Sequence, residues 1–244
     1  MRCAKVVLVL LLATSWVISV NAQVYVPASV AGFRLVAVPG DAINVPARLR
    51  RYVPKGNVLR AEFRTRLVPS GEMIYLYDDG EEIFPRIYLG ALRDGRNFKL
   101  LDGGITGIEG FLLVRLDKGK NGLAVAYHTG EDSADTEFVI FAASGDSYKR
   151  IFYEPTMEGQ MQIVPSSPLA FRLWSAAPEF DPKDLDHSCV WCRHRFRIQT
   201  YAWDGRNFRL TNNPLTKKFL RPVDPDPSTA FIAAQMSGEP AKKK

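Results

Sequence analysis

The residues best able to do chemistry lie in one short segment of the last third of the chain. His187, Cys189, Cys192 and His194 occur within eight residues, and the remaining cysteine, Cys3, lies near the N-terminus. Thiols of exported proteins are normally oxidised, and the chain begins with an export signal, described below. The first interpretation is therefore a local Cys189–Cys192 disulfide that stabilises a long loop.

The same four side chains support two other kinds of site. Two thiolates and two imidazoles are a complete set of tetrahedral zinc ligands, although their spacing is tighter than in most zinc motifs. A Cys-x-x-Cys pair can also do thiol redox chemistry, which normally requires the first cysteine to lie at a helix N-terminus. Haem attachment is excluded because Arg193, and not a histidine, follows Cys192. The disulfide, the zinc site and the redox pair all stay open at this point.

Acidic residues gather in three loops that occupy equivalent places in a repeating pattern. Carboxylates on one face can bind calcium or a basic partner, whereas acidic residues in ordinary solvated loops need no ligand. Both interpretations fit the sequence, which predicts that the three loops meet on one face. The residues concerned are Asp78, Asp79, Glu81, Glu82, Glu131, Asp132, Asp135, Glu137, Glu179, Asp181, Asp184 and Asp186.

One serine suggests an enzymatic interpretation. Gly145-Asp146-Ser147 and the later Asp184 and His187 resemble the nucleophile and base blocks of the GDS-type esterases. That resemblance implies attack by Ser147, with His187 as its base and Asp184 orienting the base. The Gly-Asp-Ser is also one copy of a turn that recurs twice elsewhere in the chain, so a structural role explains it. We therefore expect no enzymatic activity.

His128 and most of the tryptophans are expected to have structural roles. His128 follows an apolar run, and we expect it on the surface. Trp174 and Trp203 lie in strand-like segments, where large rings fill cores, although aromatic faces also stack on carbohydrate ligands. Trp191 lies between the two cysteines and is the one expected to be exposed or to cover that loop.

The N-terminus predicts export. Arg2 and Lys5 precede an almost wholly apolar run, Val6 to Val20, and Val20-Asn21-Ala22 offers a small-residue cleavage site. The run is short for a membrane anchor, which needs roughly 20 residues. We therefore expect residues 1–22 to be a cleaved signal peptide, the protein to be periplasmic or extracellular, and no membrane span to remain after cleavage.

The net charge of +6 is a weak indication of a partner. The chain ends in Lys242-Lys243-Lys244, and its one basic patch is loose. A nucleic-acid-binding protein normally concentrates its charge more strongly, so we do not expect nucleic acid as a partner. The loose patch consists of Arg48, Arg50, Arg51, Lys55, Arg60, Arg64 and Arg66.

Three related turn motifs determine the expected fold. They are Asp94-Gly95-Arg96-Asn97-Phe98, Ser144-Gly145-Asp146-Ser147-Tyr148 and Asp204-Gly205-Arg206-Asn207-Phe208, with glycines 50 and 60 residues apart. Apolar runs rich in β-branched and aromatic residues flank each motif, which is typical of a β-hairpin with a glycine in its turn. A second hairpin precedes each motif. The sequence therefore predicts three four-stranded units, near residues 60–101, 108–154 and 158–211.

Units of four antiparallel strands, each about 40–50 residues long, are typical of β-propeller blades. The segment Val114-Arg115-Leu116-Asp117-Lys118-Gly119-Lys120-Asn121-Gly122-Leu123-Ala124-Val125 resembles the FG-GAP/VCBS repeats of integrin-alpha-type propellers. The resemblance implies a propeller-like architecture. Of the family's calcium loop, this segment keeps Asp117, Asn121 and Gly122, so calcium binding is not carried over from the resemblance.

The predicted fold class is all-β, with about three blade-like repeats forming a partial or small propeller over residues 60–235. Residues 23–59 contain one clear strand, from Phe33 to Val38, and are expected to form a partial blade. Phe231 to Ala234 is expected to add a strand, and residues 236–244 to be a disordered basic tail. Three units with bare edge strands require a partner, a second copy or a further blade.

Together these patterns predict an exported, non-enzymatic protein that binds another protein or a surface polymer through its inter-strand loops. The alternative is a zinc-binding or thiol redox role for the loop that contains the cysteines. No cofactor is expected beyond calcium at the acidic loops or zinc at the Cys/His cluster.

Overall fold

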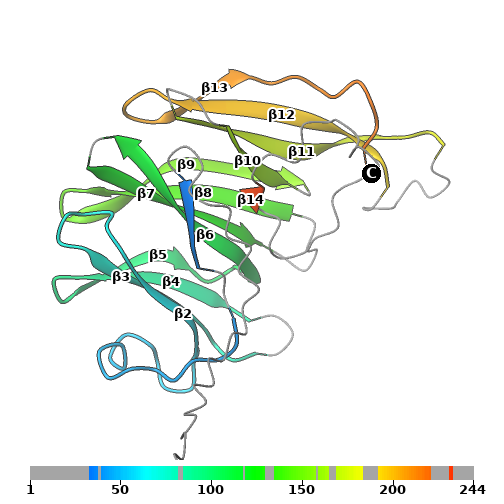
Figure 1. Cartoon of the computed structure of the whole chain (residues 1–244). Helices are drawn as coiled ribbons and strands as arrows, with labels where there is room; N and C mark the ends of the chain where they lie inside the picture. Colours follow the sequence, from blue (N-terminus) through cyan, green and yellow to red (C-terminus); the bar gives the residue numbers. More distant parts are fainter. Residues whose placement is uncertain are drawn as a thin grey trace, which may run out of the picture.

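The computed structural model describes residues 33–37, 40–81, 85–117, 119–129, 135–157, 159–164, 169–183, 192–220 and 231–232. Within these residues the chain is all-β, with fourteen strands and no helix. Three open sheets lie in layers, one stacked on another (Figure 1). The predicted signal peptide, residues 1–22, and the predicted tail, residues 236–244, lie outside the described residues.

Each layer is built from four consecutive antiparallel strands. The first sheet contains β2 (Val58–Thr65), β3 (Glu72–Asp78), β4 (Ile87–Arg93) and β5 (Arg96–Asp102). The second contains β6 (Gly107–Asp117), β7 (Lys120–His128), β8 (Asp135–Ser144) and β9 (Ser147–Met157). The third contains β10 (Gln160–Val164), β11 (Ala170–Phe180), β12 (His194–Trp203) and β13 (Phe208–Asn212). These strands confirm the three four-stranded units that the sequence predicts.

Two further strands extend the second and third sheets. β1 (Phe33–Ala37) pairs antiparallel with β6, and β14 (Phe231–Ile232) pairs parallel with β10. Along the first sheet, Ile43 forms a β-bridge to Leu59 on β2. The described terminal segments therefore pair with the first strand of every sheet, at edges that the sequence predicts to be bare. The N-terminal strand β1 therefore belongs to the second sheet.

The middle sheet is buried on both faces. Leu123 and Val139 pack against the first sheet, and Ala124 and Phe138 pack against the third. Successive strand residues point to opposite faces, so a strand that is covered on both sides must be apolar at every position. This requirement explains the unbroken apolar run in β7. Full burial of one large apolar side chain contributes about 1.5–3 kcal/mol to folding, so these two interfaces dominate the stability of the stack.

A short segment covers the outer face of the first sheet. Residues 46–53 form successive turns held by backbone hydrogen bonds. These turns place Leu49 and Val53, both almost fully buried, against Tyr75 on β3. The buried side chains of Leu49 and Val53 therefore anchor this segment, including its basic residues, on the first sheet.

The two described tryptophans belong to the core, as the sequence predicts. Trp174 is 3% exposed and donates its indole N–H to Gln162 Oε1 at 3.0 Å. Trp203 is 8% exposed and packs against Phe208, with ring centroids 5.1 Å apart. Trp191 lies outside the described residues.

The three motif turns are β-hairpin turns, as predicted, but they differ in detail. Asp94 and Gly95 have φ values of 50° and 75°, which is the geometry of a type I′ turn. Gly145 and Gly205 also have positive φ, 57° and 93°. The third turn is longer than the other two, and the Asp204 carboxylate accepts two backbone hydrogen bonds inside it. The shared glycine supplies a left-handed residue in each turn.

The turns define two ends of the stack. We call the end that carries the β2–β3, β4–β5, β6–β7, β8–β9 and β12–β13 turns the hairpin end. The opposite end, which carries the β3–β4, β7–β8 and β11–β12 connections, is the loop end. In Figure 1 the hairpin end lies at the left and the loop end at the right.

Candidate functional site

The described residues include part of the Cys/His cluster. His187 and Cys189 lie outside them, whereas Cys192 is buried and His194 begins β12. The His194 ring is buried, with Nδ1 3.1 Å from the carbonyl oxygen of Ala177 on β11. Nε2 of His194 is buried without a hydrogen-bond partner in the described part of the chain. The disulfide, zinc and redox interpretations therefore stay predictions, and His194 itself is packed into the third sheet.

Ser147 has a structural role in its turn. Its hydroxyl donates to the carbonyl oxygen of Ser144 at 3.0 Å, across the β8–β9 turn. Asp184 and His187, the base groups implied by the esterase resemblance, lie outside the described residues. Asp181, just before them, follows β11 at the loop end, roughly 35 Å of strand away from the hairpin end. The described structure thus supports the turn interpretation of Gly-Asp-Ser.

The described members of the predicted acidic face lie at the loop end, in or beside three equivalent connections. The described ones are Asp78, Asp79, Glu81, Asp135, Glu137, Glu179 and Asp181, whereas Glu82, Glu131, Asp132, Asp184 and Asp186 lie outside the described residues. Within the described ranges, no group of three or more His, Cys, Asp or Glu side chains is arranged to hold a metal ion. The calcium interpretation therefore has no assembled site among these residues.

Several of these carboxylates bond to groups in their own loops or on the neighbouring strand. Asp78 is 3% exposed, and its Oδ2 lies 2.5 Å from Nε of Arg60. Asp181 is also buried and pairs with Arg193 at 2.9 Å across the β11–β12 connection. Asp79 accepts a backbone hydrogen bond across the β3–β4 loop. These carboxylates stabilise the loops that carry them.

His128 is not the surface residue that the sequence predicts. Its side chain is 19% exposed, with Nε2 2.6 Å from Glu109 Oε1 and Nδ1 2.9 Å from the carbonyl oxygen of Asp135. Burial by itself would lower the pKa of His128, but the hydrogen bonds to Glu109 and Asp135 and the charge of Glu109 outweigh it and raise the pKa. His128 therefore joins β6, β7 and β8 at the loop end.

The segment that resembles a calcium loop forms a tight hairpin. The β6–β7 turn is short, and Gly122 lies inside β7. Asp117 Oδ2 accepts a hydrogen bond from the indole of Trp203 at 3.3 Å, and Asn121 Nδ2 donates to the carbonyl oxygen of Arg66 at 2.6 Å. Two of the three residues shared with the family motif, Asp117 and Asn121, therefore support contacts between sheets, whereas Gly122 packs within the second sheet.

Two hollows at the hairpin end are lined by described residues. The first, of about 710 Å³, involves the first two sheets, and its lining includes Arg48, Arg64, Arg66 and Glu72. Glu72 is 5% exposed, and its carboxylate accepts a hydrogen bond from the backbone amide of Leu67 at 2.6 Å. The carboxylate of Glu72 is thus buried and bonded within the β2–β3 turn. The exposed charges in the lining of this hollow are those of Arg48, Arg64 and Arg66, which are positive.

The second hollow, of about 470 Å³, lies mainly between the second and third sheets. Its lining includes Lys120, Lys149, Arg150 and Arg206, with Trp203 as part of the wall. Within the described residues, the side chains of Lys120, Lys149 and Arg206 form no ion pair. This hollow therefore holds uncompensated positive charge.

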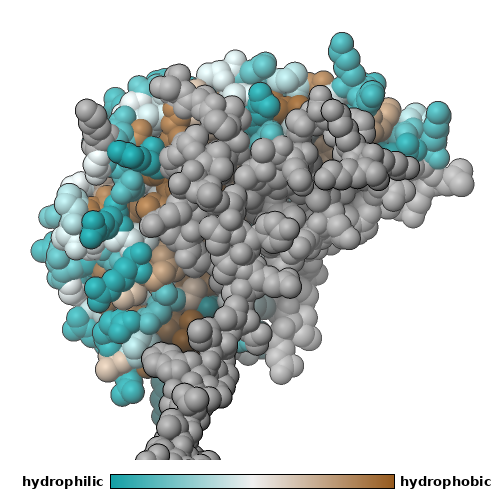
Figure 2. Space-filling model, viewed as in Figure 1, coloured by the Kyte–Doolittle hydropathy of each residue, from teal (hydrophilic) through white to brown (hydrophobic). Residues whose placement is uncertain are grey.

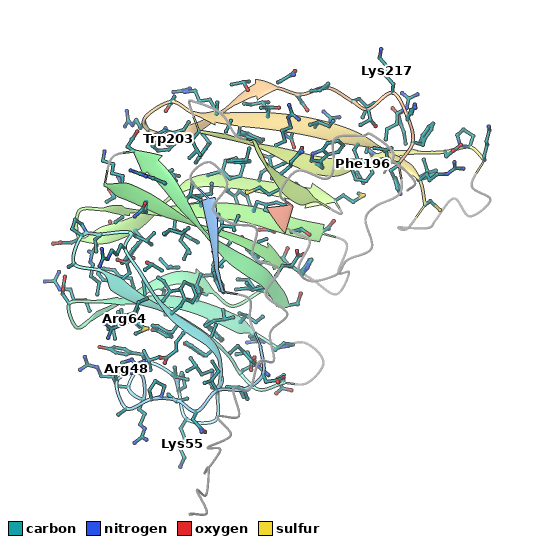
Figure 3. All side chains as sticks on the ribbon, viewed as in Figure 1. Arg48, Lys55, Arg64, Phe196, Trp203 and Lys217 are labelled. Carbon is teal, nitrogen blue, oxygen red and sulfur yellow. The ribbon has the colours of Figure 1, made fainter. Side chains whose placement is uncertain are left out.

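The two hollows are neighbours, because Asn121 lines both of them. Figure 3 shows Arg48, Arg64 and Trp203 at the same end of the stack, spread across its layers. Hydrophilic side chains are prominent along this edge of the molecule in Figure 2. We call the combined surface the basic groove, which consists of Arg48, Arg64, Arg66, Lys120, Lys149, Arg150 and Arg206.

The sequence indicated part of this groove. Arg48 and Arg64 belong to the loose basic patch noted above, but Lys120, Lys149 and Arg206 come from turns of the second and third sheets that are far apart in the chain. The alignment of equivalent turns by sheet stacking brings them together. The feature of the sequence that could have indicated this groove is the presence of basic residues in and after the repeated turn motifs.

Comparison with protein-family models, with curated proteins and with solved structures finds no match for the chain. The resemblance to FG-GAP/VCBS repeats therefore stays a prediction. The described part of the chain contains no helix that is long and apolar enough to cross a membrane.

Proposed function

We propose that the protein is an exported, non-enzymatic binding protein of β-propeller type, which holds its ligand with the turns of the hairpin end. The observation that carries the proposal is the basic groove, to which turns from all three sheets contribute. A ligand with negative charge, either on a protein or on a surface polymer, is complementary to it.

The scaffold suits a binding role. Three sheets packed face to face, each of consecutive antiparallel strands, are the arrangement found in neighbouring propeller blades. Binding residues are commonly presented by turns on a rigid core, because the core fixes their positions while the turns vary. The predicted signal peptide supports export. The hydroxyl of Ser147, the candidate nucleophile, is hydrogen-bonded within its own turn, which supports a structural role.

The test is equilibrium binding of the mature chain, residues 23–244, to a panel of polyanions and to neutral dextran. We expect binding to at least one polyanion, weakened by added salt because exposed charges are screened. The variant Lys149→Glu/Arg206→Glu should bind at least tenfold more weakly, since it reverses two charges of the groove. The control variant Lys55→Glu/Lys217→Glu makes the same charge change away from the groove, at positions labelled in Figure 3. Equal affinity of the two variants contradicts the proposal.

One observation favours a second candidate function, the zinc-binding alternative for the Cys/His cluster. Nε2 of His194 is buried and lacks a hydrogen-bond partner among the described residues, as expected for a ligand whose metal is bound nearby. Mass spectrometry of the native protein distinguishes the interpretations. One bound zinc per chain supports the zinc site, whereas a two-proton mass deficit that disappears on reduction supports the Cys189–Cys192 disulfide.

A further inference from the structure

Two anions beside the second hollow, Asp204 and Asp117, are already engaged by protein groups. The Asp204 carboxylate accepts hydrogen bonds from the backbone amides of Asn207 and Arg206 and pairs with Arg209. Those hydrogen bonds lower the pKa of Asp204 to about 2, so it stays ionised and bound within its turn. Asp117 accepts from the Trp203 indole. Among the groove's cations, Arg48 pairs with Glu62 at 2.7 Å. The exposed side chains of Arg64, Arg66, Lys120, Lys149 and Arg206 form no ion pair within the described residues, so their charge is available to a ligand.

Uncharged polar groups line the second hollow together with cations. Ser144, Asn121 and Asn207 line the second hollow together with Lys149 and Arg206. Amide and hydroxyl groups can both donate and accept, so they match ligand hydroxyls, whereas Lys and Arg match carboxylates. A ligand that carries both hydroxyl and carboxylate groups satisfies the whole lining.

The groove crosses several layers of the stack. Stacked sheets lie roughly 10 Å apart, so the two hollows repeat at about that distance across the hairpin end. Arg64 and Arg66 line the first hollow, Lys120 and Lys149 line the second, and Asn121 lines both. A small anion can occupy one hollow, but a chain with repeating charges can engage both at once, which multiplies its affinity.

The lining is a poor match for two other polyanions. Single-stranded nucleic acids are held by exposed aromatic rings on which bases stack, whereas Trp203 is 8% exposed and its N–H is bonded to Asp117. Peptides are usually held by strand addition or by an apolar anchor pocket. The groove is built at hairpin turns. In its lining Leu67 and Leu116 are buried and Leu92, Leu113 and Ile151 are half-buried, so it presents no exposed apolar anchor side chain.

From these contacts we infer that the ligand of the basic groove is an acidic polysaccharide, a sugar chain whose carboxylates meet the cations and whose hydroxyls meet the amides. The inference rests on the binding function proposed above and specifies its ligand class. Lys149 and Arg206 bind carboxylates in the second hollow, Arg64 and Arg66 bind them in the first, and Asn121 lies between the two sets.

The test compares four immobilised polymers with the full mature chain at one ionic strength: polygalacturonate, polyglutamate, single-stranded DNA and neutral dextran. We expect the tightest binding to polygalacturonate and none to dextran. Lys149→Glu/Arg206→Glu should weaken binding to polygalacturonate at least tenfold, and Lys55→Glu/Lys217→Glu less than twofold. Ser144→Ala/Asn207→Ala should weaken binding to polygalacturonate about tenfold, while leaving the binding of polyglutamate within twofold, because it removes hydrogen bonds to hydroxyl groups.

The outcomes separate the two proposals. Tighter binding to polyglutamate or DNA than to polygalacturonate, with the same loss in the groove variant, overturns the polysaccharide inference but leaves the binding function standing. No binding to any of the polymers, or equal losses in the groove and control variants, overturns both. Thermal melting of each variant confirms that it is folded before binding is compared.

Discussion

Arg93 at the end of β4 donates a hydrogen bond from Nη2 to the carbonyl oxygen of Gly145, in the β8–β9 turn, at 3.2 Å. The Arg93 guanidinium also lies 4.9 Å from the ring centre of Phe98 and 5.2 Å from that of Tyr148. Phe98 and Tyr148 are the aromatic residues of the first two turn motifs. The repeated motif therefore does more than close hairpins, since it docks the first sheet onto the second.

Replacing Arg93 should loosen this contact. Arg93 is 7% exposed, so Arg93→Ala removes a charged hydrogen bond and leaves space between two rings. We expect the free energy of unfolding to fall by about 2–3 kcal/mol in urea titrations. Arg93→Lys should recover less than half of the loss, because an ammonium cannot stack or donate in the planar arrangement of a guanidinium. An unfolding free energy for Arg93→Ala within about 0.5 kcal/mol of the parent would show that the contact is unimportant.

A glycine on β4 allows the first sheet to bury a tyrosine. A Cβ atom at Gly90 would overlap the ring of Tyr75, whose hydroxyl donates to Asn97 Oδ1 at 2.5 Å. Gly90→Ala should therefore destabilise the protein by about 1–3 kcal/mol through overpacking. Gly40→Ala is the matched control, because nothing lies within 4 Å of the Cβ that it would add. Similar unfolding midpoints for the two variants would contradict this explanation.

The pair formed by His128 and Glu109 predicts a pH dependence of stability. The pKa of His128 is raised in the folded protein, so its contribution is complete below the unfolded value of about 6.5 and is lost as the pH rises through the folded pKa. The unfolding free energy, measured between about pH 5.5 and 9, should fall across that window. In Glu109→Gln the fall should be smaller, because the charge that favours protonated His128 is gone. An unchanged profile in this variant would refute the assignment.

The loop-end carboxylates should act as structural groups. Asp78→Asn leaves the partly exposed Arg60 without its charged partner, and we expect a loss of about 1–3 kcal/mol in unfolding free energy. Calcium should not change the unfolding midpoint relative to a chelator, because Asp78, Asp79 and Asp181 already bond to protein groups. A midpoint that rises with calcium concentration would instead support a cation site at the loop end.

Local patterns predicted much of the fold. Asp94-Gly95 combines two residues that tolerate positive φ, so the hairpin was visible in the sequence. The apolar run Leu123–Ala126 indicated a strand, and its unbroken character reflects burial on both faces. The strand at Phe33 was also predicted, but its place beside β6 was not, because strand pairing over long sequence separation depends on tertiary packing.

The candidate site was less predictable, for a related reason. Lys120, Lys149 and Arg206 are ordinary exposed residues in sequence, and their meeting depends on the alignment of turns from different sheets. His128 was misjudged because its partner Glu109 lies on another strand. A candidate site can be predicted from residue types only when its members are close in sequence, as in the Cys/His cluster.

The central claim, that the ligand binds at the hairpin end, is tested most directly by amide hydrogen exchange of the mature chain with and without polygalacturonate. The account predicts slower exchange in residues 64–72, 117–122, 143–151 and 203–208, with little change in residues 78–81 and 179–183. Slower exchange concentrated at the loop end, or no change at the hairpin turns under saturating polymer, would contradict it.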